Sequence, residues 1–103
     1  MCRNNQLTSL NISDNPALEG VDCSENNLNS LDVSNNSMLT SLNCDGNQLT
    51  SLDVSINTDL ETLSLKGIPS LNKVCVWEMP FPPTGVEVDT TGSPNVYFTT
   101  DCN

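Results

Sequence analysis

The side chains best suited to chemistry in this 103-residue chain are its five cysteines, because the chain contains no histidine. Without histidine it lacks the commonest general base, nucleophile activator and zinc ligand. Cys2, Cys23 and Cys44 are spaced 21 residues apart, and Leu65 continues the series. A position that takes either cysteine or leucine requires a compact apolar group, which a buried thiol provides. We therefore interpret these three cysteines as core residues and not as a ladder of metal ligands.

The other two cysteines, Cys75 and Cys102, occupy a different kind of position. Cys75 lies between Val74 and Val76, which we expect to point inward, so its own side chain should face outward. A bridge from Cys75 to Cys102 would close a loop of roughly 28 residues and stabilise the chain by about 3–4 kcal/mol. Such a bridge would suit an exported protein, and the alternative is two free thiols in a cytoplasmic one.

A further pattern, Asp-x-Ser-x-Asn, occurs at residues 22–26, 32–36 and 53–57 and is similar to part of a calcium-binding loop. An EF-hand loop also needs a glycine at its sixth position and a distal bidentate glutamate, and none of the three stretches has both. No phosphate loop, nucleophile elbow or recognisable pair of catalytic carboxylates is present. The sequence therefore predicts a protein that is not an enzyme and has no metal and no cofactor.

A repeated leucine–asparagine pattern must position all of these residues. The pattern Leu-x-x-Leu-x-apolar-x-x-Asn fits five times, and two later copies keep the apolar residues without the asparagine. The copies start alternately 10 and 11 residues apart up to residue 60, so the full unit is two half-units and about 21 residues long. Fixed periods of this size indicate a solenoid, in which each coil buries its apolar edge against its neighbours.

Each half-unit alternates inward apolar and outward polar side chains, as a short strand with one buried edge does. Strands are expected near residues 9–12, 20–23, 30–33, 41–44, 51–54, 62–65 and 73–76. The fold class is therefore a β-rich solenoid of about 3.5 coils, with parallel strands in two narrow sheets and little or no α-helix. We expect the repeated asparagines to point inward and bond turn backbone groups. They are Asn15, Asn26, Asn36, Asn47 and Asn57.

These repeats resemble the bacterial leucine-rich repeats of the 21-residue class, sometimes called IRREKO. Residues 39–57 match the consensus LxxLx(L/C)xxNxLxxLDLxxNxx, and the resemblance covers residues 2–76. It implies a secreted or surface protein of the kind found in Bacteroides-like bacteria, which binds a protein or a glycan. Localisation is accordingly expected to be extracellular or at the cell surface, although the chain carries no signal peptide.

Two regions follow from the extent of the repeats. Residues 1–76 form the repeats, which start within a unit, so we expect a fragment without an N-terminal cap that could form an end-to-end homodimer through its first coil. Residues 77–103 form a C-terminal cap, with Val86–Val88 and Val96–Phe98 as two strands of a hairpin or arm. The aromatic residues lie in and beside this cap, and an aromatic ligand platform around Trp77 is the alternative.

The charge of the chain restricts its partners. Thirteen acidic and three basic residues give a net charge of −10, and the three cations lie far apart in the sequence. Nucleic acid and anionic membrane surfaces are therefore excluded as expected partners. No apolar run is long enough to cross a bilayer, so membrane insertion is not expected either.

The outward positions of the two predicted sheets differ. In the second sheet they repeat Asn or Asp followed by Ser, which is typical of a scaffold surface. In the first sheet they vary from coil to coil, which favours recognition of a protein or glycan partner. The alternative is a structural spacer with no partner of its own. The varying residues, and so the candidate binding residues, are Asp22, Ser24, Asn43, Asp45, Ser64 and Lys66.

Overall fold

The computed structural model describes residues 5–102. Within that range there are seven strands, each of three residues, and no helix. Most strands centre on one buried residue with a more exposed residue on each side, as Leu42 lies between Ser41 and Asn43. The strands are β1 (Gly20–Asp22), β2 (Ser41–Asn43), β3 (Ser51–Asp53), β4 (Thr62–Ser64), β5 (Lys73–Cys75), β6 (Glu87–Asp89) and β7 (Tyr97–Thr99).

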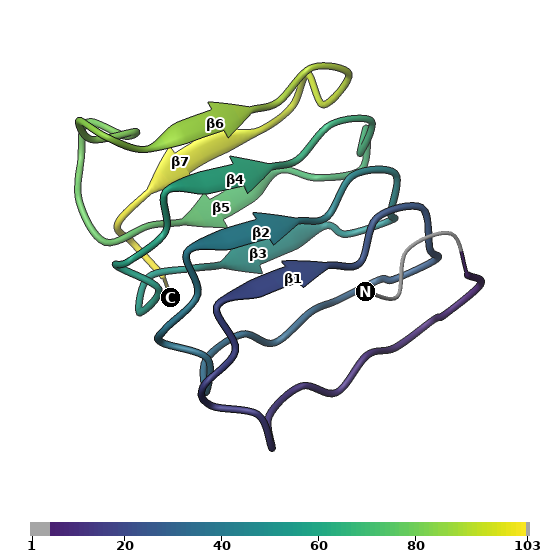
Figure 1. Ribbon diagram of the computed structural model, residues 1–103. Coiled ribbons are helices and arrows are strands. Elements are labelled where there is room, and N and C mark those ends of the chain that lie inside the picture. The colour runs from purple at the N-terminus through teal and green to yellow at the C-terminus, as the bar shows by residue number, and fades with distance from the viewer. Residues whose placement is uncertain (1–4, 103) are drawn as a thin grey trace.

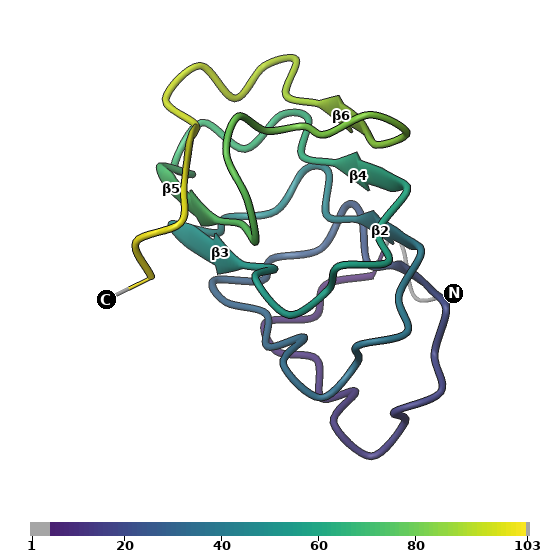
Figure 2. The same ribbon diagram turned by 90° about the vertical axis from the view of Figure 1, so that its left-hand side faces the viewer.

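The chain winds as a solenoid whose successive coils contribute strands to two parallel sheets (Figure 1). The first sheet has the order β1-β2-β4-β6 and the second has the order β3-β5-β7. The two sheets lie on opposite sides of the coils, as the view in Figure 2 shows. In each register the inward residues align, Val21 with Leu42 and then Leu63, for example. The predicted parallel two-sheet solenoid is confirmed.

The core is a column of leucine, valine and cysteine side chains between the sheets. Leu28, Leu39, Leu49, Cys23 and Cys44 have no exposed surface. Cys23 and Cys44 pack in this column, as their spacing predicted, and Cys2 lies outside the described residues. Branched and sulfur-containing side chains of similar size fill such a column without leaving voids.

Inward asparagines form a ladder along both turns of the coils, with Asn26 and Asn47 on one turn and Asn36 and Asn57 on the other. The amide nitrogen of Asn47 donates to the carbonyls of Cys23 and Cys44, both at 3.0 Å, and its Oδ1 accepts from Leu28 N at 3.0 Å. Each amide thus satisfies backbone groups of its own coil and of the preceding one. The prediction is confirmed for the buried Asn26, Asn36, Asn47 and Asn57.

The prediction is wrong for Asn15, which is exposed. Asn36, the same position one unit later, donates to Ile12 O, a carbonyl 24 residues earlier in the chain. Asn15 instead uses its own backbone carbonyl, which accepts from the Asn36 amide at 3.0 Å.

The alternation of half-units of 10 and 11 residues has a hydrogen-bonding cause. After Asn36 and Asn57, the extra residue allows a tight turn in which the following leucine N–H bonds to the asparagine carbonyl, at 3.2 Å in both cases. After Asn26 the turn is one residue shorter, and the Leu28 N–H bonds to an asparagine side chain of the next coil. In the longer turns the leucine N–H is already bonded to the backbone, so it cannot donate to an asparagine side chain. The Oδ1 atoms of Asn36 and Asn57 are accordingly buried without a partner among the described residues.

Two predicted strands, at 9–12 and 30–33, are wrong. Leu31 and Val33 are buried as expected, but residues 30–33 do not form a strand. A hollow of about 260 Å³ lies between residues 30–34 and β3. Inward alternation predicts which side chains are buried, whereas a strand also needs backbone bonds to a neighbouring coil, which period two alone does not reveal.

The C-terminal segment forms another coil instead of the predicted hairpin. β6 pairs in parallel with β4, and β7 pairs in parallel with β5, so the two segments extend both sheets. Ser93 takes the place of the ladder asparagine, because its buried hydroxyl accepts from Ile68 N and donates to Leu65 O. Trp77 meets Phe81 edge to face and both pack against the core, which favours packing over a ligand platform.

In the described range, four turns have a left-handed backbone at the same position, and one of these four places a side chain there. Gly46, Gly67 and Gly92 have φ of 68°, 67° and 77°, and Glu25 has φ of 57°. A residue with a Cβ atom loses roughly 1–2 kcal/mol in this conformation. Replacing Glu25 with glycine would remove this cost, but glycine's larger loss of entropy on folding offsets part of the stability gained.

We therefore expect Glu25→Gly to raise the free energy of unfolding by about 0.5–1 kcal/mol, measured by urea denaturation. Glu25→Ala is the matched control, because it removes the carboxylate and keeps the strained backbone. An equal gain in both variants would assign the effect to the charge of Glu25 and contradict the backbone argument.

Candidate partner-binding face

The outer face of the first sheet is a shallow groove that crosses all four strands. Two adjoining hollows, of about 500 and 330 Å³, share Thr62 and Ser64 of β4 in their linings. The parallel register aligns the outward residues in two rows, one at the strand starts and one at the strand ends. The first row is Gly20, Ser41, Thr62 and Glu87, and the second is Asp22, Asn43, Ser64 and Asp89.

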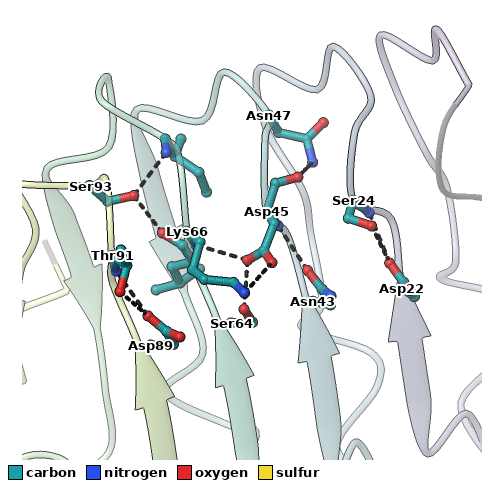
Figure 3. A network of polar contacts seen from close by, with 12 residues as sticks. Asp22, Ser24, Asn43, Asp45, Asn47, Ser64, Lys66, Asp89, Thr91 and Ser93 are labelled. Atoms are coloured by element: carbon teal, nitrogen blue, oxygen red, sulfur yellow. Dashed lines mark hydrogen bonds and ion pairs between the residues drawn. The ribbon is translucent and has the colours of Figure 1, made fainter.

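The second row caps the turns that follow the strands (Figure 3). Oδ1 of Asp22 accepts from the N–H of Ser24 at 3.1 Å and from its hydroxyl at 2.6 Å. Asp89 accepts the same two bonds from Thr91, at 3.0 and 2.7 Å. The Thr91 hydroxyl, and then its N–H, lower the pKa of the Asp89 carboxyl because they stabilise its charged form. These residues are therefore turn caps as well as surface groups.

The turn that follows β4 is capped by a residue of the preceding coil. Ser64 has no side-chain carbonyl oxygen to cap the next turn, so Asp45 supplies one across the coils. Oδ1 of Asp45 accepts from Ser64 Oγ at 2.6 Å and from Lys66 N at 2.8 Å. The Lys66 ammonium lies 3.9 Å from Oδ2 of Asp45, with 49% of the lysine side chain exposed. This cluster links two coils and partly neutralises the face.

The structure thus gathers most, but not all, of the candidate binding residues. Asn43, Asp45, Ser64 and Lys66 form one cluster, in which Asn43 caps Asp45 N at 3.0 Å. Asp22 lies in the groove beside it. Ser24 was expected to face outward but is buried, with 6% of its surface exposed, and its hydroxyl donates to Asp22 Oδ1.

Sequence reasoning missed the other row of the groove, at the strand starts. Ser41 and Thr62 line it, and Glu87 extends it to β6. The alternation of inward and outward side chains along a strand identifies them, since each precedes an inward residue just as Asn43 and Ser64 follow one.

The buried cysteines Cys23 and Cys44 pack in the core and do not line this groove. Cys23 Sγ lies 4.0 Å from Cys44 Sγ and donates to Asn43 O at 3.4 Å. The contact with Cys23 and the complete burial of Cys44 raise the pKa of the Cys44 thiol well above its usual value. A buried neutral thiol is a packing group and a poor nucleophile.

The predicted bridge between Cys75 and Cys102 is confirmed, with Cα atoms 5.5 Å apart. It lies on the second sheet, away from the groove, where Cys75 aligns with Asp53 of β3. Cys75 is buried and Cys102 is exposed. The bridge ties the last residues of the chain to the middle of the stack.

The comparisons with known proteins bear on the fold. No protein-family model matches the chain, and no curated protein matches it. One solved structure, the functional domain of InlJ from Listeria monocytogenes, which includes a cysteine ladder, matches with a TM-score of 0.69 and 23% identity. The match covers 89% of this chain and 24% of InlJ's, so this chain spans about a quarter of that structure.

In the range 5–102, no helix could cross a membrane. The parallel strands, the helix-free coils and the match to InlJ all indicate the same fold. The chain has a leucine-rich-repeat-like solenoid fold.

Proposed function

We propose that this solenoid is a non-enzymatic binding module of an exported bacterial protein, and that a protein or glycan partner lies in the groove of the first sheet. The observation that carries the proposal is the groove itself, which crosses four coils and is lined by residues that change from coil to coil. The lining groups are hydroxyls, an amide and carboxylates, which donate to and accept from polar partners. Export is supported by the bridge between Cys75 and Cys102, since such bridges persist in oxidising compartments.

The test places a bulky side chain at the centre of the groove. Thr62 lines both hollows, so Thr62→Arg would obstruct them together. Ser51→Arg is the matched control, because Ser51 occupies the start of a strand in the second sheet and is also exposed. Binding would be measured on a glycan array and against a displayed peptide library, and confirmed by titration. We expect a ligand whose affinity falls at least about tenfold with Thr62→Arg and is unchanged with Ser51→Arg.

A spacer with no partner is the second candidate, and the turn caps favour it. Asp22, Asn43 and Asp89 each use an oxygen to hold the following turn, so their polarity has a structural purpose. Under this reading neither library yields a ligand. That result, or an equal loss of binding in both arginine variants, would contradict the proposed recognition face.

A further inference from the structure

We propose that reduction of the Cys75–Cys102 bridge creates a zinc site on the second sheet, formed by both thiolates and the carboxylate of Asp53. Their three ligand atoms, the two sulfurs and a carboxylate oxygen, all lie within 4.8 Å of one another. Ligands at about 2.3 Å on two corners of a zinc tetrahedron are about 3.8 Å apart, so small side-chain movements suffice. Thiolates and a carboxylate are ligands that zinc favours, and a water molecule would complete the tetrahedron.

Two of the three ligands are held in place by the sheet. Asp53 on β3 and Cys75 on β5 are register partners, so their side chains leave the same face of the sheet side by side. Their strands are joined further by the bond from Val54 N to Cys75 O at 2.9 Å. Only Cys102, on the exposed C-terminal segment, has to adjust its position. A site with two fixed ligands and one adaptable ligand is partly preorganised.

The carboxylate of Asp53 is also better placed to bind a metal than its equivalent one unit earlier. Oδ1 of Asp53 accepts from Ser55 N at 2.9 Å, which orients the carboxylate from outside the site. In the preceding coil, Asp32 accepts both the N–H and the hydroxyl of Ser34, at 2.9 and 2.6 Å. The Ser34 hydroxyl, followed by its N–H, lowers the pKa of Asp32. Asp32 therefore supplies a matched control without neighbouring thiols.

The volume and the charge around the proposed zinc site are compatible with a bound ion. A hollow of about 120 Å³ is lined by Asp53, both cysteines and Lys73. Two thiolates and one carboxylate carry three negative charges, which Zn²⁺ reduces to one, and Lys73, which lines the same hollow, carries the opposite charge. In the reduced chain, zinc would thus fasten the C-terminal segment where the disulfide fastens it in the oxidised chain.

Small thiols and small disulfides are sufficient to reduce and reoxidise the bridge. Two low-molecular-weight thiols reduce the bridge, giving two protein thiols and one small disulfide. Zinc binding forms two Zn–S bonds and releases two protons. Reoxidation by a small disulfide takes two electrons from the thiolates, forms the S–S bond again and releases Zn²⁺.

The experiment titrates the full chain with Zn²⁺ in competition with a chromophoric chelator, and with Cd²⁺ to detect thiolate absorption. We expect the reduced protein to bind one ion and the oxidised protein to bind none at this site. Asp53→Asn should weaken binding by roughly tenfold or more, and Asp32→Asn should leave it unchanged. Asn at position 53 can still accept the Ser55 N–H, as Asn43 accepts the N–H of Asp45, so the turn survives.

The buried cysteines provide the decisive second arm, because Cys23 and Cys44 are also thiols in contact. The double variant Cys75→Ser, Cys102→Ser keeps them and removes the proposed site. Metal binding that persists in this variant, or that is equal in Asp53→Asn and the reduced parent, would overturn the proposal. So would a reduced parent that does not compete with the chelator.

Discussion

Asn47→Ala should lower the free energy of unfolding by about 3–5 kcal/mol, because it removes a buried amide that serves several backbone groups at once. The amide donates to the carbonyls of Cys23 and Cys44 at 3.0 Å, and to that of Asp45 at 3.3 Å. Its Oδ1 accepts from Leu28 N at 3.0 Å. Each buried group left without a partner costs about 1–3 kcal/mol. Urea denaturation of the oxidised protein, followed by circular dichroism, measures the loss.

Asn57→Ala is the matched control on the opposite turn. Asn57 is equally buried, but its amide donates to only two carbonyls, those of Val33 and Asn36, at 3.2 and 2.8 Å. Its Oδ1 has no partner among the described residues, so truncation removes an unsatisfied oxygen together with the donors. We expect a loss of about 1–3 kcal/mol. Equal losses in the two variants would show that side-chain volume, and not hydrogen bonding, sets the role of the ladder.

The sequence predicted the fold because the repeat encodes burial directly. The inward positions of Leu42, Leu63 and Val74 follow from period two, and the parallel stacking follows from the 21-residue period. The absence of strand pairing between residues 30–33 and β3 could not be predicted in this way, since pairing depends on how closely two coils approach. Ser93 was not recognised as a ladder residue because its hydroxyl meets the same need with a different side chain.

The candidate site was predicted less completely, for a related reason. Outward positions could be identified, but the local bonding of each side chain could not. Ser24 appeared outward by its position, yet it is buried and donates its hydroxyl to Asp22, whereas Ser34 makes the same bond to Asp32 and stays exposed. The contact of Asp45 with Ser64 and Lys66 joins residues 19 and 21 positions apart, and only the register of the coils brings them together.

Cys102→Ser should lower the free energy of unfolding by about 3–4 kcal/mol, because the bridge closes a loop with a sequence separation of 27. Without the bridge the unfolded chain has a higher conformational entropy, which favours unfolding. The substitution leaves the buried Cys75 in place and changes only the exposed partner. The measurement is urea denaturation in the presence of a metal chelator, which keeps zinc from fastening the free thiols.

Reduction supplies the internal control, because a reductant should bring the parent down to the level of Cys102→Ser and leave that variant unchanged. Thiol counting under denaturing, non-reducing conditions tests the same bridge by chemistry. Three free thiols, those of Cys2, Cys23 and Cys44, are expected from the five cysteines. Five free thiols in protein from its native compartment would mean that the bridge does not form there. That result would remove the main physical argument for export, since reducing compartments keep such pairs open.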